Sequence, residues 1–206
     1  MGGSDFPYLN FMGLRLDVFK DVYTPQEDSF LLAKHTHSLE GNILELGTGC
    51  GLSALVNASR NPSNYVFGVD LNNSAIRNAA YNARHNRITN AHFQHSDLFS
   101  RVPNVRFDSI LFNPPYLPEE ENGTQKRSML NLALYGGKNG RKQTDLFLHH
   151  LEDYLLPGGS AFLIQSSLTD IPKTVERASI LGFSAEIVEE QSFFFEKLFL
   201  LKLFRE

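Results

Sequence analysis

The sequence contains a single cysteine, Cys50, and no apolar run long enough to cross a membrane. One cysteine excludes an internal disulfide and suits a reducing compartment. The first residues also lack the basic segment and apolar core that together mark a secretory signal. We therefore expect a cytoplasmic protein that does not associate with membranes.

An excess of basic residues is also missing, because 19 Lys and Arg stand against 23 Asp and Glu, for a net charge of -4. This balance argues against a broadly basic nucleic-acid-binding surface, although it leaves room for a local basic patch. The histidines show no metal-ligand spacing, and the chain has no Ser-His-Asp arrangement, internal repeat or P-loop. We expect no metal site, and a length of 206 residues fits one α/β domain.

Residues 1–22 form a short N-terminal extension, whose partly alternating apolar residues predict a strand or hairpin. After it, Thr24, Pro25 and Glu27 match a helix start with a capping box and a proline at the first helical position. The same turn holds three further polar residues, which favour a wall of a binding site as a second interpretation: Gln26, Asp28 and Ser29.

Residues 42–55 have the pattern of a buried strand, a glycine-rich turn and a helix. Gly47, Gly49 and Gly51 permit a tight turn and a close approach of a ligand to the backbone. Their G-x-G-x-G spacing differs from the G-x-G-x-x-G of a dinucleotide site, so the glycines alone are weak evidence. An acidic residue inside the strand, Glu45, makes a ligand site at this turn more convincing.

Two further strands each end in an aspartate. Asp70 closes the strand predicted at 65–70, about 20 residues after the glycines, where such folds hold a pair of ribose hydroxyls. A small-residue helix at 73–88 leads to a third strand at 91–98, which we expect to end in Asp97. That carboxylate could accept a hydrogen bond from the exocyclic amine of adenine. The alternatives are that Asp70 is a solvated aspartate at a strand end and that Asp97 only forms a turn.

A fourth strand, predicted at 107–112, runs directly into Asn113-Pro-Pro-Tyr116. Proline fixes its own φ and keeps the preceding residue extended, so no helix satisfies the acceptors of Asn113 and Pro114. An NH2 group could donate one hydrogen to the Asn113 side-chain oxygen and the other to the Pro114 carbonyl, with Tyr116 flat against a planar substrate. The alternative is a strand end with a capping asparagine.

Residues 119–145 read as one long polar loop, which in a compact domain is either functional or disordered. Its basic residues either cover a site or form a solvated face: Lys126, Arg127, Lys138, Arg141 and Lys142. The remaining pattern predicts a helix at 145–156 broken by 157–159, a buried strand at 161–165, a helix at 175–181, and an antiparallel pair of strands at 185–189 and 198–204.

This alternation predicts an α/β fold with a doubly wound, mostly parallel, seven-stranded sheet and an antiparallel C-terminal hairpin. Ligands of such sheets bind beyond the carboxyl ends of the strands. Polar and glycine residues gather there: Glu45, Gly47, Asp70, Asp97 and Asn113.

The ordered motifs resemble those of class I S-adenosylmethionine-dependent methyltransferases: Leu44-Glu-Leu-Gly-Thr-Gly-Cys-Gly51, Asp70, Asp97 and Asn113-Pro-Pro-Tyr116. The resemblance implies a Rossmann-like fold and S-adenosylmethionine as cofactor, with S-adenosylhomocysteine as product. It implies cofactor contacts at Ser29, Glu45, Gly47, Thr48, Gly49, Asp70, Leu71, Asp97, Leu98 and Asn113. It implies a catalytic motif of Asn113, Pro114, Pro115 and Tyr116, which in that family marks transfer to a planar NH2 group.

Two flanking stretches, 23–32 and 136–141, resemble the HemK-type enzymes, and the chain is most similar to their short archaeal and eukaryotic branch. Those enzymes methylate the glutamine of the Gly-Gly-Gln motif in class I translation termination factors. Eukaryotic members use a small zinc-ribbon activator that adds a strand to the sheet edge. The edge expected here, 91–96, carries few apolar side chains beyond Phe93, so the sequence leaves this partner open.

Two other functions remain open from the sequence. An amino-methyltransferase acting on adenine or guanine of RNA or DNA would have to extract the base from its stack and bind phosphates. The basic residues between 126 and 142 allow this, whereas the acidic balance of the whole chain counts against it. A non-catalytic methyltransferase-like scaffold would not need the complete set of motifs.

Overall fold

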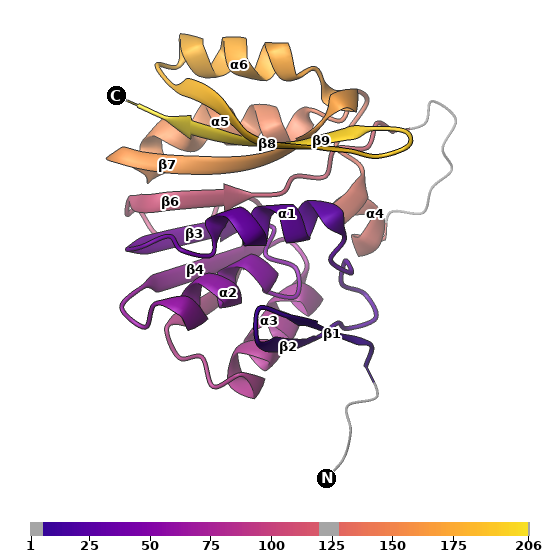
Figure 1. Cartoon of the computed structure of the whole chain (residues 1–206), viewed down its shortest axis with the longest axis vertical. Helices are drawn as coiled ribbons and strands as arrows, with labels where there is room; N and C mark the ends of the chain where they lie inside the picture. Colours follow the sequence, from indigo (N-terminus) through magenta and orange to yellow (C-terminus); the bar gives the residue numbers. More distant parts are fainter. Residues whose placement is uncertain (1–5, 120–127, 206) are drawn as a thin grey trace. The chain divides into compact units, whose positions relative to one another are not determined.

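The computed structural model describes residues 6–119 and 128–205 (Figure 1). The chain divides into two compact units, residues 1–102 and residues 103–206. The first unit contains β1 (Tyr8–Phe11), β2 (Leu14–Asp17), α1 (Glu27–Thr36), β3 (Asn42–Leu46), α2 (Leu52–Arg60), β4 (Tyr65–Asp70), α3 (Asn73–His85) and β5 (Ala91–His95). The second contains β6 (Phe107–Phe112), α4 (Met129–Leu134), α5 (Lys142–Tyr154), β7 (Leu155–Ser166), the 3₁₀ helix η1 (Ser167–Thr169), α6 (Ile171–Ile180), β8 (Ser184–Ser192) and β9 (Lys197–Phe204).

The main sheet has seven strands in the order β5-β4-β3-β6-β7-β9-β8. β3, β4 and β5 pair in parallel, and β6 pairs in parallel with β7. β9 is antiparallel to both β7 and β8, which makes the last two strands a hairpin. The predicted α/β class and the antiparallel end of the sheet are therefore confirmed. A separate two-stranded sheet, β1 with β2, confirms the hairpin predicted near the N-terminus.

In the first unit, β3 is buried along most of its length, with Ile43, Leu44 and Leu46 fully excluded from solvent. A strand buried on both faces is what a parallel sheet covered by helices requires. Helix α2 packs on α1 and also contacts α3 and the central strands. Its Leu55 and Val56 are fully buried. This core fixes the carboxyl ends of β3 and β4, where two of the predicted site stretches begin.

Two asparagines of α3 and the asparagine at its C-cap, spaced four residues apart, attach the N-terminal hairpin to this helix. The side chains of Asn78, Asn82 and Asn86 bond the backbone of alternate residues at and just after β2. Asn82, for example, accepts from the Asp17 N–H at 3.0 Å and donates to the Asp17 carbonyl at 2.9 Å. Amide side chains at one helix face thus replace a missing neighbouring strand, and satisfy backbone groups that would otherwise be buried without partners.

Asn82→Leu is expected to lower the free energy of unfolding by about 3 kcal/mol, because buried backbone groups of Asp17 and Cys50 lose their partner. Urea denaturation measures the change. Asn73→Leu, at an exposed position of the same helix, is the matched control and should change stability by less than about 0.5 kcal/mol. Equal effects of the two substitutions would contradict the role assigned to Asn82.

The start of α1 differs from the sequence-based prediction. The helix begins at Glu27 with Gln26 as its N-cap, and no side-chain cap is formed. The predicted capping box at Thr24 with Pro25 as first helical residue is therefore wrong. Instead, the buried Asp28 carboxylate accepts from the Tyr23 hydroxyl at 3.2 Å. This contact is also local, since it joins residues five positions apart, but it differs from the capping box that the sequence predicts.

In the second unit, residues 128–145 are not one loop as predicted. Ser128 caps a short helix, α4, by accepting from the Asn131 N–H at 3.1 Å. Beyond it, the Leu117 N–H donates to the Leu134 carbonyl, and the Gly136 N–H donates to the Leu117 carbonyl, both at 2.9 Å. These bonds tie the chain after α4 to the segment that follows β6. Lys126 and Arg127 lie outside the described residues.

Helix α5 begins at Lys142 and ends at Tyr154, and β7 starts at the next residue. Pro157-Gly-Gly159, predicted to separate helix and strand, lies instead within β7, where the register with β6 shifts. A proline and two glycines are tolerated at such an irregularity. Helix α6 begins at Ile171, four residues before the predicted start, with Asp170 as its cap.

Candidate active site

The turn after β3 has the backbone conformation that its glycines permit. Gly47, Gly49 and Gly51 have φ values of 65°, 56° and 91°, and only glycine adopts this region readily. A Cβ atom at Gly49 would meet no atom of residues 6–119 and 128–205 within 4 Å, whereas one at Gly51 would lie 3.1 Å from the Ala79 Cβ. Gly51 thus allows α2 and α3 to pack closely, and Gly49 leaves open space in which a ligand can approach the backbone.

The buried Glu45 carboxylate stabilises this turn through hydrogen bonds. The Glu45 Oε2 accepts from the Thr48 hydroxyl at 2.6 Å and from the Ala54 N–H at 3.0 Å. Burial raises the pKa of the Glu45 carboxyl to about 7, although hydrogen bonds from Thr48, Ser53 and Ala54 oppose the shift. Glu45 therefore joins the turn to the start of α2.

The raised pKa makes stability depend on pH. Between about pH 4.5 and 7 the folded chain keeps the Glu45 proton that the unfolded chain has lost, so stability falls as the pH rises through this window. The expected fall is about 3 kcal/mol relative to Glu45→Gln, which has no proton to lose at this position. Urea denaturation of both proteins from pH 4.5 to 8 measures it. A difference between them that is constant with pH would show that the folded carboxyl is ionised throughout.

Asp70 lies at the end of β4 and faces the same turn. Its Oδ2 accepts from the Gly49 N–H at 2.9 Å, and its Oδ1 accepts from the Asn72 N–H at 2.8 Å. Burial raises the pKa of the Asp70 carboxyl, and these two donors oppose the shift. Each carboxylate oxygen keeps a further lone pair, so Asp70 can still accept from a pair of hydroxyls. The next residue, Leu71, is exposed.

β5 ends at His95, which pairs with Asp70, and not at Asp97 as predicted. Asp97 is exposed in a turn, where its carbonyl accepts from the Ser100 N–H at 2.9 Å. Leu98 follows with a φ of 43°. The turn therefore follows the carboxyl end of β5, next to that of β4, and the aspartate remains available to a ligand.

Ser29 lies in the first turn of α1. Its N–H and hydroxyl both donate to Asp28 Oδ1, at 2.6 and 3.1 Å. Its polar atoms are therefore used within the helix start, where the Tyr23 hydroxyl also bonds Asp28.

In the second unit, Asn113 follows β6 and has a buried side-chain oxygen. Its Oδ1 finds no hydrogen-bond partner among residues 6–119 and 128–205. A buried acceptor without a partner is costly and needs an explanation. Pro114 beside it is buried, and Tyr116 is half-buried. The arrangement provides an acceptor for a donor that is not part of the described chain.

The backbone after Asn113 is held in place by two glycines after α4. A Cβ atom at Gly136 would lie 2.3 Å from the Pro115 carbonyl oxygen, and one at Gly140 would lie 2.1 Å from the Tyr116 carbonyl oxygen. Only a residue without a side chain can pack this closely on these carbonyls. Gly136 and Gly140 therefore determine the path of the Asn-Pro-Pro-Tyr segment.

Arg141 is 2% exposed and belongs to this support, which contradicts its reading as part of a solvated basic face. Its Nη1 donates to the carbonyls of Thr169 and Asp170, and its Nη2 pairs with Asp145 at 3.1 Å. A basic residue in a polar stretch gives no local sign that it will be buried. Lys142, by contrast, is exposed.

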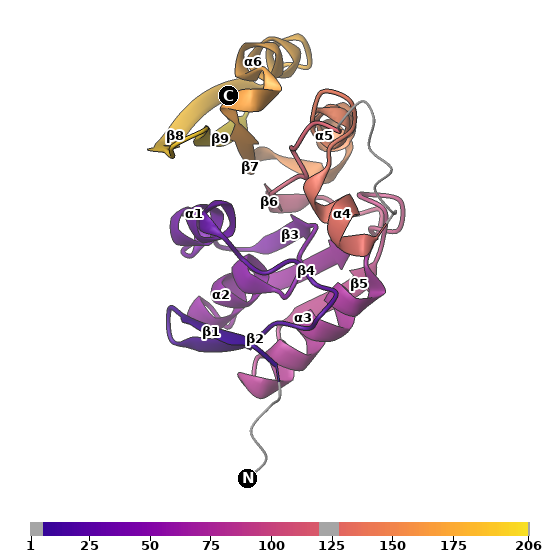
Figure 2. The ribbon, with the colours of Figure 1, turned by 90° about the vertical axis from the view of Figure 1, so that its right-hand side faces the viewer.

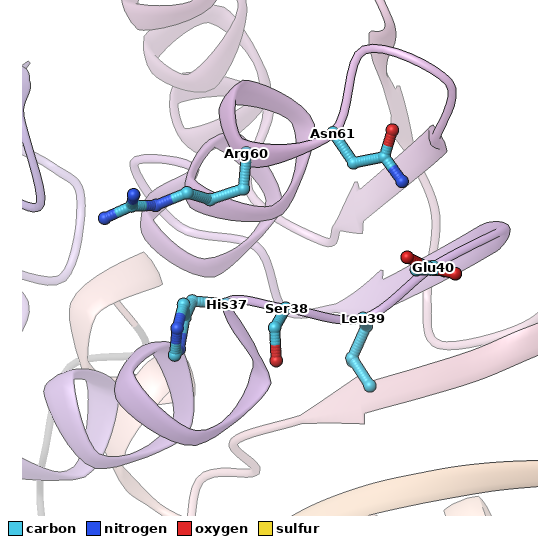
Figure 3. Close-up of a pocket in the computed structure, with 6 residues that line it drawn as sticks. All are labelled: His37, Ser38, Leu39, Glu40, Arg60 and Asn61. Carbon is cyan, nitrogen blue, oxygen red and sulfur yellow. The ribbon is translucent and has the colours of Figure 1, made fainter.

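A surface hollow of about 360 Å³ in the first unit lies away from these residues (Figure 3). It is lined by His37, Ser38, Leu39, Glu40, Arg60 and Asn61. These residues follow α1 and end α2, at the amino end of β3. Ligands of parallel sheets bind at the opposite, carboxyl ends, and none of the predicted site residues lines the hollow.

Comparison with known proteins gives the family. A family model described as "Methyltransferase small domain" matches residues 21–134. A Methanocaldococcus jannaschii protein, named a protein N5-glutamine methyltransferase, is 40% identical over 194 residues, which cover 94% of this chain and 96% of that protein. The chain belongs to the methyltransferase small domain family.

A bacterial relative and a solved structure extend the comparison of this methyltransferase. The release factor glutamine methyltransferase of Coxiella burnetii is 28% identical over 155 residues. These residues cover 72% of this chain and 56% of that enzyme. The structure of the E. cuniculi Mtq2-Trm112 complex, described as responsible for methylation of the eRF1 termination factor, matches with a TM-score of 0.68. It covers 90% of this chain and 99% of the matched chain at 22% identity, a likeness that supports the fold.

Within the described residues of this methyltransferase, no group of His, Cys, Asp and Glu side chains is arranged to hold a metal ion. No described helix is long and apolar enough to span a membrane.

Proposed function

We propose that this methyltransferase transfers a methyl group from S-adenosylmethionine to the side-chain amide of the glutamine in the Gly-Gly-Gln motif of a class I release factor. The observation that carries the proposal is the buried Asn113 side-chain oxygen, which has no hydrogen-bond partner among the described residues and lies directly before a proline. The names of the M. jannaschii and C. burnetii relatives support glutamine as the acceptor and a release factor as the substrate.

The acceptor amide would be held by the segment Asn113 to Tyr116. Asn113 Oδ1 and the Pro114 carbonyl would each accept one hydrogen of the glutamine NH2, and Pro115 keeps the backbone rigid between them and Tyr116. The ring of Tyr116 would lie against the planar amide. These residues act by orienting the nitrogen and by stabilising positive charge as it develops there. No strong general base is required, because the amide proton becomes acidic once the new bond forms.

The cofactor would be held by the ends of β3, β4 and β5. The open space at Gly49 and the free lone pairs of Asp70 fit a nucleoside with an extended tail. When bound, S-adenosylmethionine supplies an electrophilic methyl group. The remaining candidates would line its binding site: Ser29, Glu45, Gly47, Thr48, Leu71, Asp97 and Leu98, with Asp97 on the adenine amine and Asn113 near the methyl group.

Asp70→Ala is expected to weaken binding of S-adenosylmethionine by about 1–3 kcal/mol, because the ribose hydroxyls lose a charged acceptor. That corresponds to roughly 5- to 150-fold in Kd by calorimetry. Asp70→Asn keeps one acceptor oxygen, so its affinity for S-adenosylmethionine should lie between those of wild type and the alanine variant. Unchanged affinity in the alanine variant would remove Asp70 from the ribose role.

We also propose that the two compact units serve a single methyltransferase domain, residues 1–206. The first unit supplies most of the cofactor candidates, and the second supplies the acceptor candidates. Neither set is sufficient for methyl transfer alone.

A base in RNA or DNA is the competing acceptor, since an adenine or guanine amine would fit the same two oxygens. Burial of Arg141 removes one of the basic residues on which phosphate binding would depend. A non-catalytic scaffold is the other alternative, and failure to bind S-adenosylmethionine would favour it.

Parallel assays with methyl-labelled S-adenosylmethionine separate these functions. A purified class I release factor should acquire label. Total RNA should not, and neither should a release factor in which alanine replaces the glutamine of the Gly-Gly-Gln motif. Label in RNA but not in the factor would overturn the proposal in favour of a nucleobase substrate.

The matched Mtq2 structure is a complex with Trm112, which supports a partner subunit for this chain as well. The edge of the sheet at β5 is a candidate site for a small activator subunit of this kind. An unpaired edge strand can accept another strand. Amide hydrogen exchange of residues 91–95 should slow when a zinc-ribbon subunit from the same organism is added. Unchanged exchange would exclude this edge as the contact.

A further inference from the structure

The turn between β8 and β9 exposes consecutive aromatic side chains that the proposed chemistry does not use. Phe194 is 93% exposed and Phe195 is 87% exposed, and Phe193 beside them is also exposed. The rings of Phe194 and Phe195 contact each other edge to face, with centroids 4.6 Å apart. Single apolar residues are common on protein surfaces, but a run of aromatics at the tip of a hairpin is typical of an interaction site.

Hydrogen bonds hold the backbone of this turn against η1. The Phe193 N–H donates to the Glu196 carbonyl at 2.8 Å. The Ser166 hydroxyl donates to Glu196 Oε2 at 2.6 Å, and the Lys197 N–H donates to the Ser167 hydroxyl at 3.0 Å. Since the backbone is already ordered, little further entropy is lost when a partner covers the rings.

The turn and the acceptor segment both lie at the carboxyl ends of the parallel strands of the second unit. Phe112 pairs with Leu163 in the parallel strands β6 and β7, and Ser166 pairs with Leu198 in the antiparallel strand β9. The β8–β9 turn therefore projects beyond the carboxyl end of β7, on the side of this unit where α4 lies (Figures 1 and 2). With strands about 4.8 Å apart, the turn is roughly 12 Å to the side of β6.

Buried contacts connect this turn with the acceptor segment. Gly140 packs on the Tyr116 carbonyl, and its neighbour Arg141 bonds the carbonyls of Thr169 and Asp170. These last two residues end and follow η1, which holds the turn through Ser167. A substrate bound to the aromatic turn would therefore be held in a fixed position relative to Tyr116.

The charges around the turn indicate what kind of partner it binds. Three acidic residues lie on or near the turn, Glu189 and Glu190 on β8 and Glu196 in the turn itself. The one basic residue among them, Lys197 at the start of β9, pairs with Glu190 at 2.6 Å, so the net charge of this group is negative. An acidic surface with exposed phenylalanines repels a phosphate backbone. It suits an apolar protein surface with basic residues around it.

We infer that the Phe193–Phe195 turn is a docking surface for the protein substrate, which it contacts on the folded surface outside the Gly-Gly-Gln segment. The inference rests on the proposed function. A distance of about 12 Å is too long for the glutamine side chain itself but short for a folded protein. The turn would thus distinguish the whole release factor from an isolated peptide with the same motif.

The test is a double substitution, Phe194→Ser with Phe195→Ser, in the full chain. The Kd for an immobilised, purified class I release factor should rise at least about tenfold, as for aromatic residues at the centre of an interface. Binding of S-adenosylmethionine and the melting temperature should remain those of wild type. Ile180→Ser is the matched control, because Ile180 is 77% exposed at the other end of this unit, where α6 ends, and should leave the Kd unchanged.

The outcomes separate the docking surface from the proposed function. If wild type methylates the release factor and the double variant binds it as tightly as wild type does, the docking surface is wrong and the function stands. If wild type methylates no release factor, both fail. If the wild type is a dimer that the double substitution converts to monomers, the turn joins two copies of this chain and the inference is overturned.

Discussion

Asn113→Ala is expected to lower kcat for methyl transfer by about 10²- to 10³-fold, the usual cost of removing one preorganised polar group from an active site. The reason is that the buried Asn113 Oδ1, which has no partner in the described chain, is the group proposed to orient the glutamine NH2. Single-turnover transfer of labelled methyl to a release factor measures the loss.

The affinity of the same variant for S-adenosylmethionine should stay within about threefold of wild type, because the main cofactor candidates lie elsewhere. Asn113→Asp keeps an acceptor oxygen at this position and should retain more activity than alanine. If calorimetry shows that Asn113→Ala loses cofactor affinity and turnover in parallel, Asn113 belongs to the cofactor rather than to the acceptor.

Gly140→Ala is the second substitution with a large expected effect. The new Cβ would lie 2.1 Å from the Tyr116 carbonyl oxygen and 2.9 Å from the Thr169 Cγ2, so backbone must move. We expect at least a 100-fold loss of kcat/KM for the release factor, because displacement of the acceptor by 1 Å suffices for a loss of this size. Steady-state methyl transfer measures the loss of kcat/KM, and thermal denaturation measures the effect of the substitution on stability.

Gly158→Ala supplies the control for this substitution. Gly140 and Gly158 have φ values of 68° and 79°, so alanine is strained at both positions, but a Cβ at Gly158 meets no atom of the described part of the chain within 4 Å. Gly158→Ala should lower stability by about 1–2 kcal/mol and leave kcat/KM unchanged. Equal losses of activity in both variants would mean that backbone strain, and not contact with Tyr116, determines the effect.

The parts of the fold that the sequence predicted are those with a strong local pattern. The sequence predicts the strands 65–70 and 107–112 with their observed bounds, because apolar runs between turn residues leave little choice. The glycine turn and Asp70 were predicted as neighbours, and the Gly49 N–H indeed bonds the Asp70 carboxylate. Spacing along the chain was enough here, since consecutive parallel strands bring their carboxyl ends together.

The parts that were missed depend on contacts distant in sequence. Nothing near Asn78, Asn82 or Asn86 shows that these side chains bond the backbone around β2, about 60 to 70 residues earlier. Burial of Arg141 likewise depends on the carbonyls of Thr169 and Asp170, some 28 residues later. A polar side chain on a helix or in a loop reads as solvated unless its distant partner is known.

The start of α1 differs from the prediction for another reason, because two local contacts compete there. A capping box is a local signal, and Thr24 with Glu27 satisfies it in the sequence, but the chain begins its helix later and uses Tyr23 and Asp28 to fix the turn. The second interpretation, a polar turn that lines a site, remains a prediction for Ser29.

Localisation of the methyl group within the release factor tests glutamine methylation most directly. After incubation with wild type and S-adenosylmethionine, tandem mass spectrometry of the Gly-Gly-Gln peptide should place one methyl group on the glutamine side-chain nitrogen. The Asn113→Ala variant should leave that peptide unmodified. A methyl group at any other residue of the factor, or on the glutamine with Asn113→Ala as active as wild type, would contradict the assignment of Asn113 as the residue that holds the amide.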